Sequence, residues 1–154
     1  MLTRNIFEIA NWFLSKEEMT HKKLQKLCYY AQCWHYATKE TALFNGDFEA
    51  WAHGPVNREL WNKLKDYKWN YIPKDELKDY ATELDDDTEY FLGVVWNTYG
   101  EFDGSQLESI THQETPWQNA RGNLDEYQRC TNKISIDDMK AYYSSLLVGD
   151  GVGE

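Results

Sequence analysis

The sequence contains little cysteine: three residues in 154, at positions 28, 33 and 130. Cys28 and Cys33 lie on one predicted helix, about 140° apart around its axis, so these two thiols cannot form a disulfide. No CxxC pair is present, and an odd count without a pairing pattern is typical of a reducing compartment. We therefore expect a cytoplasmic protein without a disulfide framework.

Long apolar runs are also missing. No stretch of 18 consecutive apolar residues occurs, so we expect no membrane-spanning segment. The N-terminus, MLTRNIFEIANWFL, lacks the basic run, the long apolar core and the small-residue cleavage site of a signal peptide. We expect neither secretion nor a membrane partner.

Positive charge is scarce. Lys and Arg together number 16 against 26 Asp and Glu residues, which gives a formal net charge of −10 at pH 7. Binding to nucleic acids or anionic membranes needs clustered cations. The cluster of Lys22, Lys23 and Lys26 is too small for a nucleic-acid footprint. The charge instead fits a soluble protein, or one with a basic partner, and we expect no nucleic-acid partner.

Signatures of catalysis are absent. No GxSxG, GxxxxGK, GxGxxG or HExxH pattern occurs, and no Cys/His spacing matches a structural zinc site. Cys28 and Cys33 sit in the middle of a helix among apolar residues, where a thiol is unreactive. We therefore expect no enzyme, no bound metal and no cofactor.

Aromatic residues, in contrast, are abundant: seven Trp, eleven Tyr and six Phe. Large rings bury much surface, and we expect most of them in the core. Trp51, Trp61, Trp69 and Trp117 lie beside predicted loops or helix starts. A minority of them left exposed would suit a protein-binding surface.

The stretch 20–38, THKKLQKLCYYAQCWHYAT, is the strongest single element. Leu24, Leu27, Cys28, Ala31 and His35 fall on one helical face. Tyr30, Cys33, Trp34 and Ala37 cover the flanks, so most of the circumference is apolar and the helix belongs in the centre of a domain. Nineteen residues span roughly 28 Å, about the width of a small domain.

The rest of the sequence predicts further helices, most of them with a candidate N-cap. These are 4–14 with Thr3 as N-cap, a helix to about 67 with Gly54 as N-cap and Pro55 at its first position, 88–99 capped by Asp86 or Asp87, a short helix from Gly104, one from Pro116 to Gly122 capped by Thr115, and 136–148 capped by Ser135. Residues 43–52 predict a short hairpin or extended segment, because Asn45-Gly46 favours a turn.

Three burial patterns accompany these helices. In the first helix the predicted buried face is Ile6, Ile9, Ala10, Phe13 and Leu14, and a hydrophobic staple joins Leu2 to Phe7. In the fourth helix the predicted buried face is Phe91, Val94, Val95 and Thr98. In the last helix it is Ile136, Met139, Tyr143, Leu146 and Leu147. We expect one compact, mostly α-helical domain over residues 1–148, built around the central helix, with a disordered tail at 149–154.

Four stretches, taken in order, resemble one known family. They are KLQKLCYYAQCWHYA (23–37), LFNGDFEAWAHGPV (43–56), the Tyr99-Gly100 pair and SITHQETPWQNAR (109–121), in which Ile110 stands where Leu is usual. They resemble the Panacea-domain family, the SocA-like, phage-associated antitoxins. The resemblance implies a largely helical domain that neutralises a toxin encoded beside it by direct protein contact. Some relatives add a DNA-binding helix-turn-helix domain, for which we expect no room in this chain.

The resemblance also carries over a recurrent set of residues. The polar members are Gln25, Gln32, Glu49, His112, Glu114 and Arg121, and Trp51, Gly54, Pro55, Pro116 and Trp117 surround them. We expect Arg121 to form a bidentate pair with Glu49 or Glu114, which His112 joins. Two interpretations are open: the network ties the 43–56 segment to the 109–121 helices, or it forms a toxin- or ligand-binding pocket. We further expect Gln25 or Gln32 to hydrogen-bond the backbone of the 43–56 or the 109–117 segment.

Three functions follow from these patterns. The first is an antitoxin that binds a cognate toxin through aromatic anchors and an acidic rim. The second, which the resemblance also implies, is an adaptor that delivers a client toxin to a protease, with a protease or chaperone as a further partner. The third is a metal- or small-molecule-binding enzyme or sensor that uses Glu49, His112, Glu114 and Arg121. The identity of the toxin, the face that binds it and the oligomeric state do not follow from the sequence.

Overall fold

The computed structural model describes the backbone of residues 4–152 and the side chains of residues 4–147. Within them, the chain forms seven α-helices and one antiparallel two-stranded hairpin, so the domain is mostly helical, as predicted. The elements are α1 (Ile6–Lys16), α2 (His21–Lys39), β1 (Glu49–Trp51), β2 (Gly54–Val56), α3 (Arg58–Leu64), the 3₁₀ turns η1 (Lys65–Tyr67) and η2 (Lys78–Tyr80), α4 (Asp86–Tyr99), α5 (Gly104–His112), α6 (Thr115–Arg121) and α7 (Ile136–Val152). No helix in the described part of the chain is both long and apolar enough to cross a membrane.

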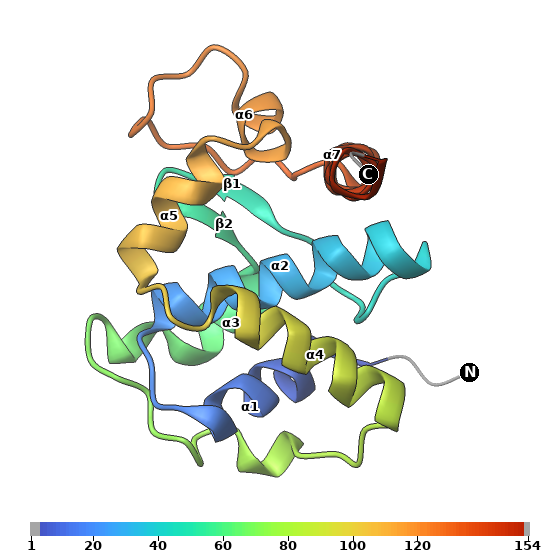
Figure 1. Cartoon of the computed structure of the whole chain (residues 1–154). Coiled ribbons are helices and arrows are strands. Elements are labelled where there is room, and N and C mark those ends of the chain that lie inside the picture. Colours follow the sequence, from blue (N-terminus) through green and yellow to red (C-terminus); the bar gives the residue numbers. More distant parts are fainter. Residues whose placement is uncertain (1–3, 153–154) are drawn as a thin grey trace.

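Helix α2 crosses the middle of the molecule, with α1 and α4 on one side and α5, α6 and α7 on the other (Figure 1). It contacts α1, α3, α4, α5, α7 and β2. Thr20 is its N-cap, as the sequence predicts, and accepts a hydrogen bond from the Lys23 N–H. Fourteen of its 19 residues are buried, because neighbouring elements cover most of its circumference. The prediction of a central helix is therefore confirmed.

Helix α1 starts two residues later than predicted. Asn5 is the N-cap and forms a capping box with Glu8, so the cap is not Thr3. Thr3 and the staple residue Leu2 lie outside the described residues. The predicted buried stripe is confirmed, and it consists of Ile6, Ile9, Ala10, Phe13 and Leu14.

The extended segment after α2 is a hairpin, but it lies later than the predicted 43–52. Strand β1 pairs with β2, and Trp51 stands opposite Gly54. Gly54 and Pro55 therefore belong to a strand and do not start a helix, which corrects the prediction. The Gly54 backbone has a φ of +106°, a conformation that closes the hairpin turn and that an N-cap does not adopt. Asn57 caps α3 instead, and its Oδ1 accepts from the Leu60 N–H at 2.9 Å.

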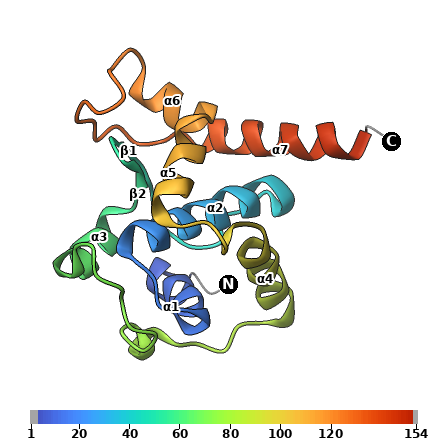
Figure 2. The ribbon, with the colours of Figure 1, turned by 60° about the vertical axis from the view of Figure 1, so that its left-hand side comes forward.

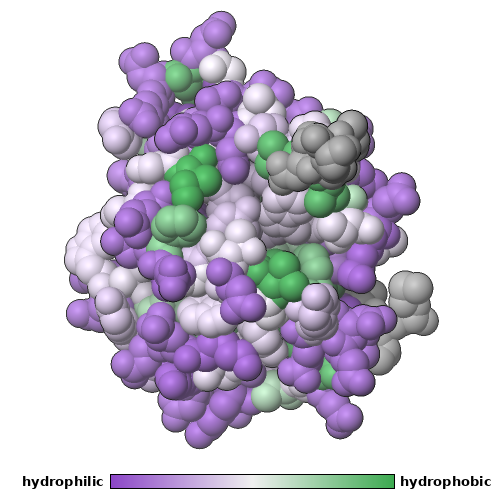
Figure 3. Space-filling model, in the orientation of Figure 1, coloured by the Kyte–Doolittle hydropathy of each residue, from purple (hydrophilic) through white to green (hydrophobic). Residues whose placement is uncertain are grey.

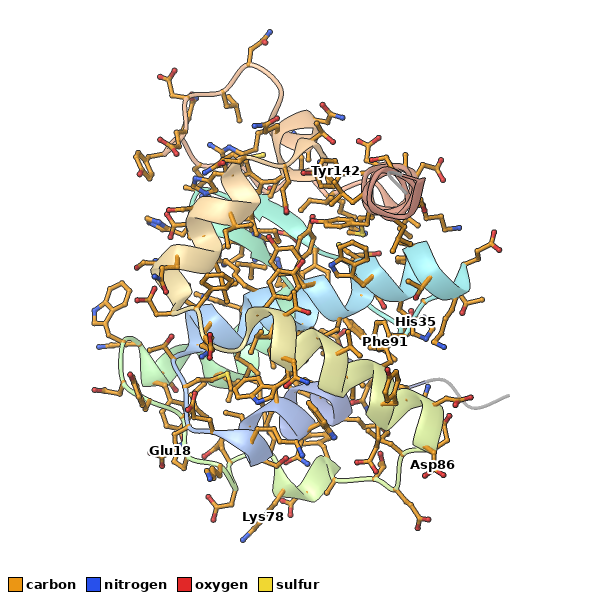
Figure 4. All side chains as sticks on the ribbon, in the orientation of Figure 1. Glu18, His35, Lys78, Asp86, Phe91 and Tyr142 are labelled. Carbon is orange, nitrogen blue, oxygen red and sulfur yellow. The ribbon has the colours of Figure 1, made fainter. Side chains whose placement is uncertain are left out.

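Helix α4 is rotated relative to the predicted orientation. Its N-cap is Asp85, and its buried residues are Thr88, Leu92, Val95 and Tyr99. Of the predicted inner face only Val95 is buried, and Val94 is 47% exposed. Phe91 is half-buried and packs edge-on against His35 near the end of α2 (Figure 4), with 5.3 Å between ring centroids. The spacing of apolar residues allowed both faces, and packing against α2 selected one of them.

The C-terminal helices also differ in detail from the predictions. Helix α5 starts at Gly104 as predicted, with Asp103 as its N-cap, whereas α6 is capped by Glu114 and not by Thr115. The Ser135 side chain accepts from the Asp138 N–H at 3.2 Å, as a cap of α7 does.

Helix α7 extends away from the body of the molecule (Figure 2). Met139 and Tyr143 are buried, but Ile136, Leu146 and Leu147 are exposed, which corrects the predicted buried face. The helix continues to Val152, past the predicted end at about 148, and residues 153–154 of the predicted tail lie outside the described residues.

Aromatic rings fill the core around α2. Tyr30 stacks on Tyr99 at 4.1 Å, and Tyr29 packs edge-on against Phe48 at 5.3 Å. Hydrophilic residues cover most of the face in Figure 3, with smaller hydrophobic patches between them. Nine of the 24 aromatic residues are buried and eight more are partly buried against the core, so most of them contribute to it as predicted. Several of the remaining rings lie near the start of α2.

Candidate functional site

Two glutamines of α2 hold the two ends of the segment that contains the hairpin. Gln32 donates to the Phe44 carbonyl at 2.8 Å and accepts from the Leu43 N–H at 2.8 Å. Gln25 accepts from the Asn57 N–H at 2.8 Å and donates to the Asn57 carbonyl at 3.2 Å. Seven residues separate the two glutamines, so both project from the same side of the helix. The predicted backbone bond of Gln32 is confirmed, and Gln25 bonds one residue beyond the predicted segment.

Helix α6 holds the hairpin from the other side. The Trp117 Nε1–H donates to the Trp51 carbonyl at 2.9 Å, and Arg121 Nη1 donates to the Ala50 carbonyl at 2.9 Å. The second Arg121 nitrogen, Nη2, donates to the carbonyls of Asp125, Glu126 and Gln128. The predicted pair of Arg121 with Glu49 or Glu114 is therefore wrong, because the buried guanidinium donates its hydrogen bonds to backbone carbonyls of β1 and of the loop after α6.

Glu49 has a different partner, Arg58, at the start of α3. The Arg58 guanidinium donates to both Glu49 oxygens, at 3.1 and 2.7 Å, and Trp51 Nε1 donates to Oε1 at 2.8 Å. Partial burial alone would raise the pKa of the Glu49 carboxyl, but the hydrogen bonds from Arg58 and Trp51 outweigh it and hold that pKa below its ordinary value. Glu49 thus fixes the outer side of the hairpin against α3.

Glu114 lies in the core between α2, α6 and α7. Its Oε1 accepts from the Tyr30 hydroxyl at 2.8 Å and from the Tyr143 hydroxyl at 2.7 Å. Burial raises the pKa of this carboxyl, and the two hydrogen bonds only partly oppose that effect. The Tyr29 hydroxyl, also buried, has no hydrogen-bond partner in the structure. Glu114 therefore acts as a polar connection between three helices.

His112 stacks on Trp117 with 3.9 Å between ring centroids, and its Nδ1 lies 3.0 Å from Glu126 Oε2. His112 bonds neither Glu49 nor Glu114, so the four polar residues of the predicted enzyme or sensor cluster do not share one network. Within residues 4–147, no group of three or more His, Cys, Asp or Glu side chains is placed to hold a metal ion. Three members of the predicted set, Gln25, Trp117 and Arg121, nevertheless share one role, because each hydrogen-bonds the backbone of the hairpin segment or the residue after it.

A groove of about 950 Å³ lies beside the hairpin, over the start of α2, and the sequence patterns did not reveal it. In Figure 1 the segments that line it lie on one side of the molecule: the start of α2, the green segment after α3 and the connection between α4 and α5. Aromatic residues line it, namely Trp51, Trp61, Trp69, Tyr71 and Phe102, together with a group of lysines, namely Lys22, Lys23, Lys26, Lys65, Lys68 and Lys74. The one available signal was the cluster of three lysines at the start of the central helix.

Two basic groups at the bottom of this groove have lowered pKa values. Burial, reinforced by the charge of Lys22, lowers the pKa of Lys26 from 10.5 to about 7. Burial, followed by the nearby Lys26, lowers the pKa of His21 to about 4. Both shifts reflect positive groups held in a poorly hydrated place.

Comparisons with known proteins match this sequence to one family and to one relative of that name. Residues 24–118 match the model of the family described as "Antitoxin SocA-like, Panacea domain", a match that begins in α2 and ends in α6. The chain is similar to the protein named Antitoxin SocA of Caulobacter vibrioides, with 29% identity over 165 residues that cover 95% of this chain and 88% of that protein. No solved structure matches the chain significantly. The chain belongs to the SocA-like, Panacea-domain family of antitoxins.

Proposed function

We propose that this chain is an antitoxin that neutralises a cognate toxin by direct protein contact and performs no chemistry of its own. The observation that carries the proposal is the family match over residues 24–118, because these residues include most of α2, the hairpin, α5 and most of the groove. Exposed aromatic residues at the groove, Trp69 at 84% and Tyr71 at 66%, add anchors of the type that protein interfaces use.

Co-expression tests the proposal directly. The protein encoded beside this chain is expressed alone and together with it, and growth is measured. Growth arrest by the neighbour alone and recovery on co-expression is the expected result. A neighbour that is harmless, or one whose toxicity this chain leaves unchanged, contradicts the proposal.

The net charge of the chain also predicts how the rate of complex formation depends on salt. A net charge of −10 attracts a basic toxin over a long range and accelerates association. The association rate constant is therefore expected to fall as the salt concentration rises from 50 to roughly 300 mM, because the Debye length shortens. A rate that salt does not change rules out this steering, and leaves the antitoxin role itself intact.

The adaptor function is the second candidate, and the projecting helix α7 is the observation that favours it. Leu146 and Leu147 are exposed on a helix that extends away from the body, which suits docking of a second protein (Figure 2). An adaptor shortens the half-life of its toxin in cells, whereas an inhibitor leaves the half-life unchanged or lengthens it. Measuring the toxin half-life with and without this chain separates the two functions.

A further inference from the structure

Lys26, near the start of α2, has no carboxylate of residues 4–147 in direct contact, although Lys22 and Lys23 both do. Lys22 Nζ lies 2.7 Å from Glu108 Oε1, and His53 Nδ1 lies 3.3 Å from Glu108 Oε2. Lys26, one turn after Lys22, has no carboxylate within 4 Å among the described residues. The Glu108 carboxylate is therefore in contact with two other basic side chains, and it acts on the Lys26 ammonium only from beyond 4 Å.

Lys26 is also poorly satisfied by hydrogen bonds. Its side chain is 1% exposed, and Nζ donates to the Pro55 carbonyl at 3.3 Å. A protonated lysine has three N–H donors, and this is the one hydrogen bond that the described residues give it. A buried cation without a counter-charge in contact destabilises a protein. Because Lys26 lines the groove, an anion that enters the groove can supply the missing counter-charge.

The walls of the groove suit a polypeptide. Trp51 and Trp61 meet edge-on at 5.4 Å beside the lysines and form an apolar wall. Six lysines and four carboxylates line the groove, a slight positive excess in a chain whose net charge is −10. Four carboxylates offset four of the six lysines, so the lining suits a ligand with one negative charge better than a polyphosphate, which needs more clustered cations. The same surface thus offers one place for an acid and one for a large apolar side chain.

We propose that this groove binds an extended segment of the toxin in which an Asp or Glu lies next to an aromatic or large aliphatic residue. The carboxylate lies beside Lys26 and Lys22, at the positive N-terminal end of α2, and the apolar side chain packs on Trp51 and Trp61. The identity of the partner rests on the proposed function, but the chemistry of the segment rests on the groove alone.

Peptides test this proposal. Fluorescent 15-residue peptides that tile the neighbouring gene product are titrated with the full chain, and anisotropy gives the Kd. Binding is expected for peptides with the acidic–apolar pattern. Lys26→Met is expected to weaken binding about 10- to 100-fold, the effect of losing a charged hydrogen bond. Replacing the peptide acid by its amide has a similar effect, and the two changes together weaken binding no further than either alone.

Lys78→Met is the matched control, because Lys78 is exposed in η2, outside the groove (Figure 4), and its replacement changes the net charge equally. It is expected to leave the Kd within a factor of two. Thermal unfolding of each variant, followed by circular dichroism, establishes that it is folded. Because Lys26→Met removes a buried charge, we expect this variant to remain folded.

Three outcomes overturn the proposal: no tile with the acidic–apolar pattern binds, Lys26→Met leaves the Kd unchanged, or the peptide and protein changes act independently. Competition by 1 mM ATP or GTP would identify a nucleotide site and would also overturn it. Co-expression rescue is measured for the same variants. Rescue by both wild type and Lys26→Met, with equal affinity for the toxin, removes the groove proposal alone, whereas failure of rescue by wild type removes the proposed function.

Discussion

Gln25 of α2 hydrogen-bonds both backbone polar groups of Asn57. Its side-chain amide thus satisfies an N–H and a carbonyl in the way that a neighbouring strand satisfies them in a β-sheet. Its Oε1 accepts from the Asn57 N–H at 2.8 Å, and its Nε2 donates to the Asn57 carbonyl at 3.2 Å. Gln32 does the same for Leu43 and Phe44 at the other end of the segment. A two-stranded hairpin alone is barely stable in water, and these two anchors attach it to the most buried helix of the fold.

Gln32→Leu is therefore expected to lower the free energy of unfolding by about 2–4 kcal/mol, because it leaves the buried Leu43 N–H and Phe44 carbonyl without partners. Urea denaturation measures the change. Gln118→Leu is the control, since Gln118 is exposed and donates one hydrogen bond to the His112 carbonyl. It is expected to cost less than about 1 kcal/mol. Equal effects of the two substitutions would refute the anchoring role of Gln32.

Gly54→Ala is expected to destabilise the fold by roughly 2–4 kcal/mol, through backbone strain and a clash together. The Gly54 φ is +106°, and a Cβ would lie 2.5 Å from Lys26 Cε. Gly93→Ala offers an internal control, because Gly93 is in helix α4 and nothing lies within 4 Å of its added Cβ. That change is expected to stabilise by about 0.5–1 kcal/mol. Thermal or urea unfolding of both variants distinguishes the positions, and a harmless Gly54→Ala would contradict the close approach of the hairpin to Lys26.

Glu114→Gln is expected to make the protein more stable than wild type, by an amount that grows as pH rises above 4.5. Burial raises the folded-state pKa of Glu114 above its ordinary value of 4.5. Between the two pKa values the unfolded chain has lost this proton and the folded chain retains it, so wild-type stability falls with rising pH. Glutamine carries no such proton. Urea titrations from pH 4 to pH 8 measure the difference.

The exposed Glu83→Gln serves as the control for that series and is expected to show no comparable trend. A difference between Glu114→Gln and wild type that stays constant with pH, or narrows as pH rises, would show that Glu114 is not held in its protonated form by burial.

Lys26→Met is expected to raise the free energy of unfolding at pH 6 by an amount on the order of a few kcal/mol. Below pH 7 the lysine is charged in both states, and the folded protein carries the full cost of the buried cation. Between pH 7 and 10.5 the folded state releases the proton while the unfolded state keeps it, so wild-type stability rises with pH and the advantage of the variant shrinks. Unfolding at pH 6 and pH 9 tests this, with Lys78→Met as the control.

A lysine that lowers stability and also lines a groove fits a residue retained for binding. If Lys26→Met proves less stable than wild type at pH 6, the ammonium is satisfied within the fold and lacks no counter-charge. The stability and peptide-binding measurements are thus independent checks on one side chain.

Local patterns predicted the helical part of this fold well. Helix α2 and its Thr20 cap were predicted because the apolar spacing and the cap are properties of adjacent residues. The start of α3 was predicted wrongly, since Gly54-Pro55 is an acceptable helix start in isolation. The pairing of β1 with β2 makes Gly54 part of a strand, and its positive φ closes the turn opposite Trp51.

The partners of buried polar groups could not be predicted in the same way. Arg121 was expected to bind a carboxylate, yet it donates to the Ala50 carbonyl and to the loop after α6. Glu49 instead pairs with Arg58. Which acceptors lie within hydrogen-bond distance of a guanidinium depends on how distant segments pack together, and the spacing of residues along the chain does not indicate that packing.

Residue order alone was enough to predict a mostly helical domain around residues 20–38 and, through four stretches of residues, the antitoxin family to which the chain belongs. Helical periodicity and family motifs are both properties of residues that are close together in the sequence, so they could be recognised without the structure. The burial of Lys26 beneath the hairpin, without a carboxylate, became visible only in the folded molecule, because nothing in the sequence separates this lysine from its neighbours at the start of α2. Dehydration of a charge depends on atoms from α2, β2 and α5 together, and no single stretch of the sequence contains them.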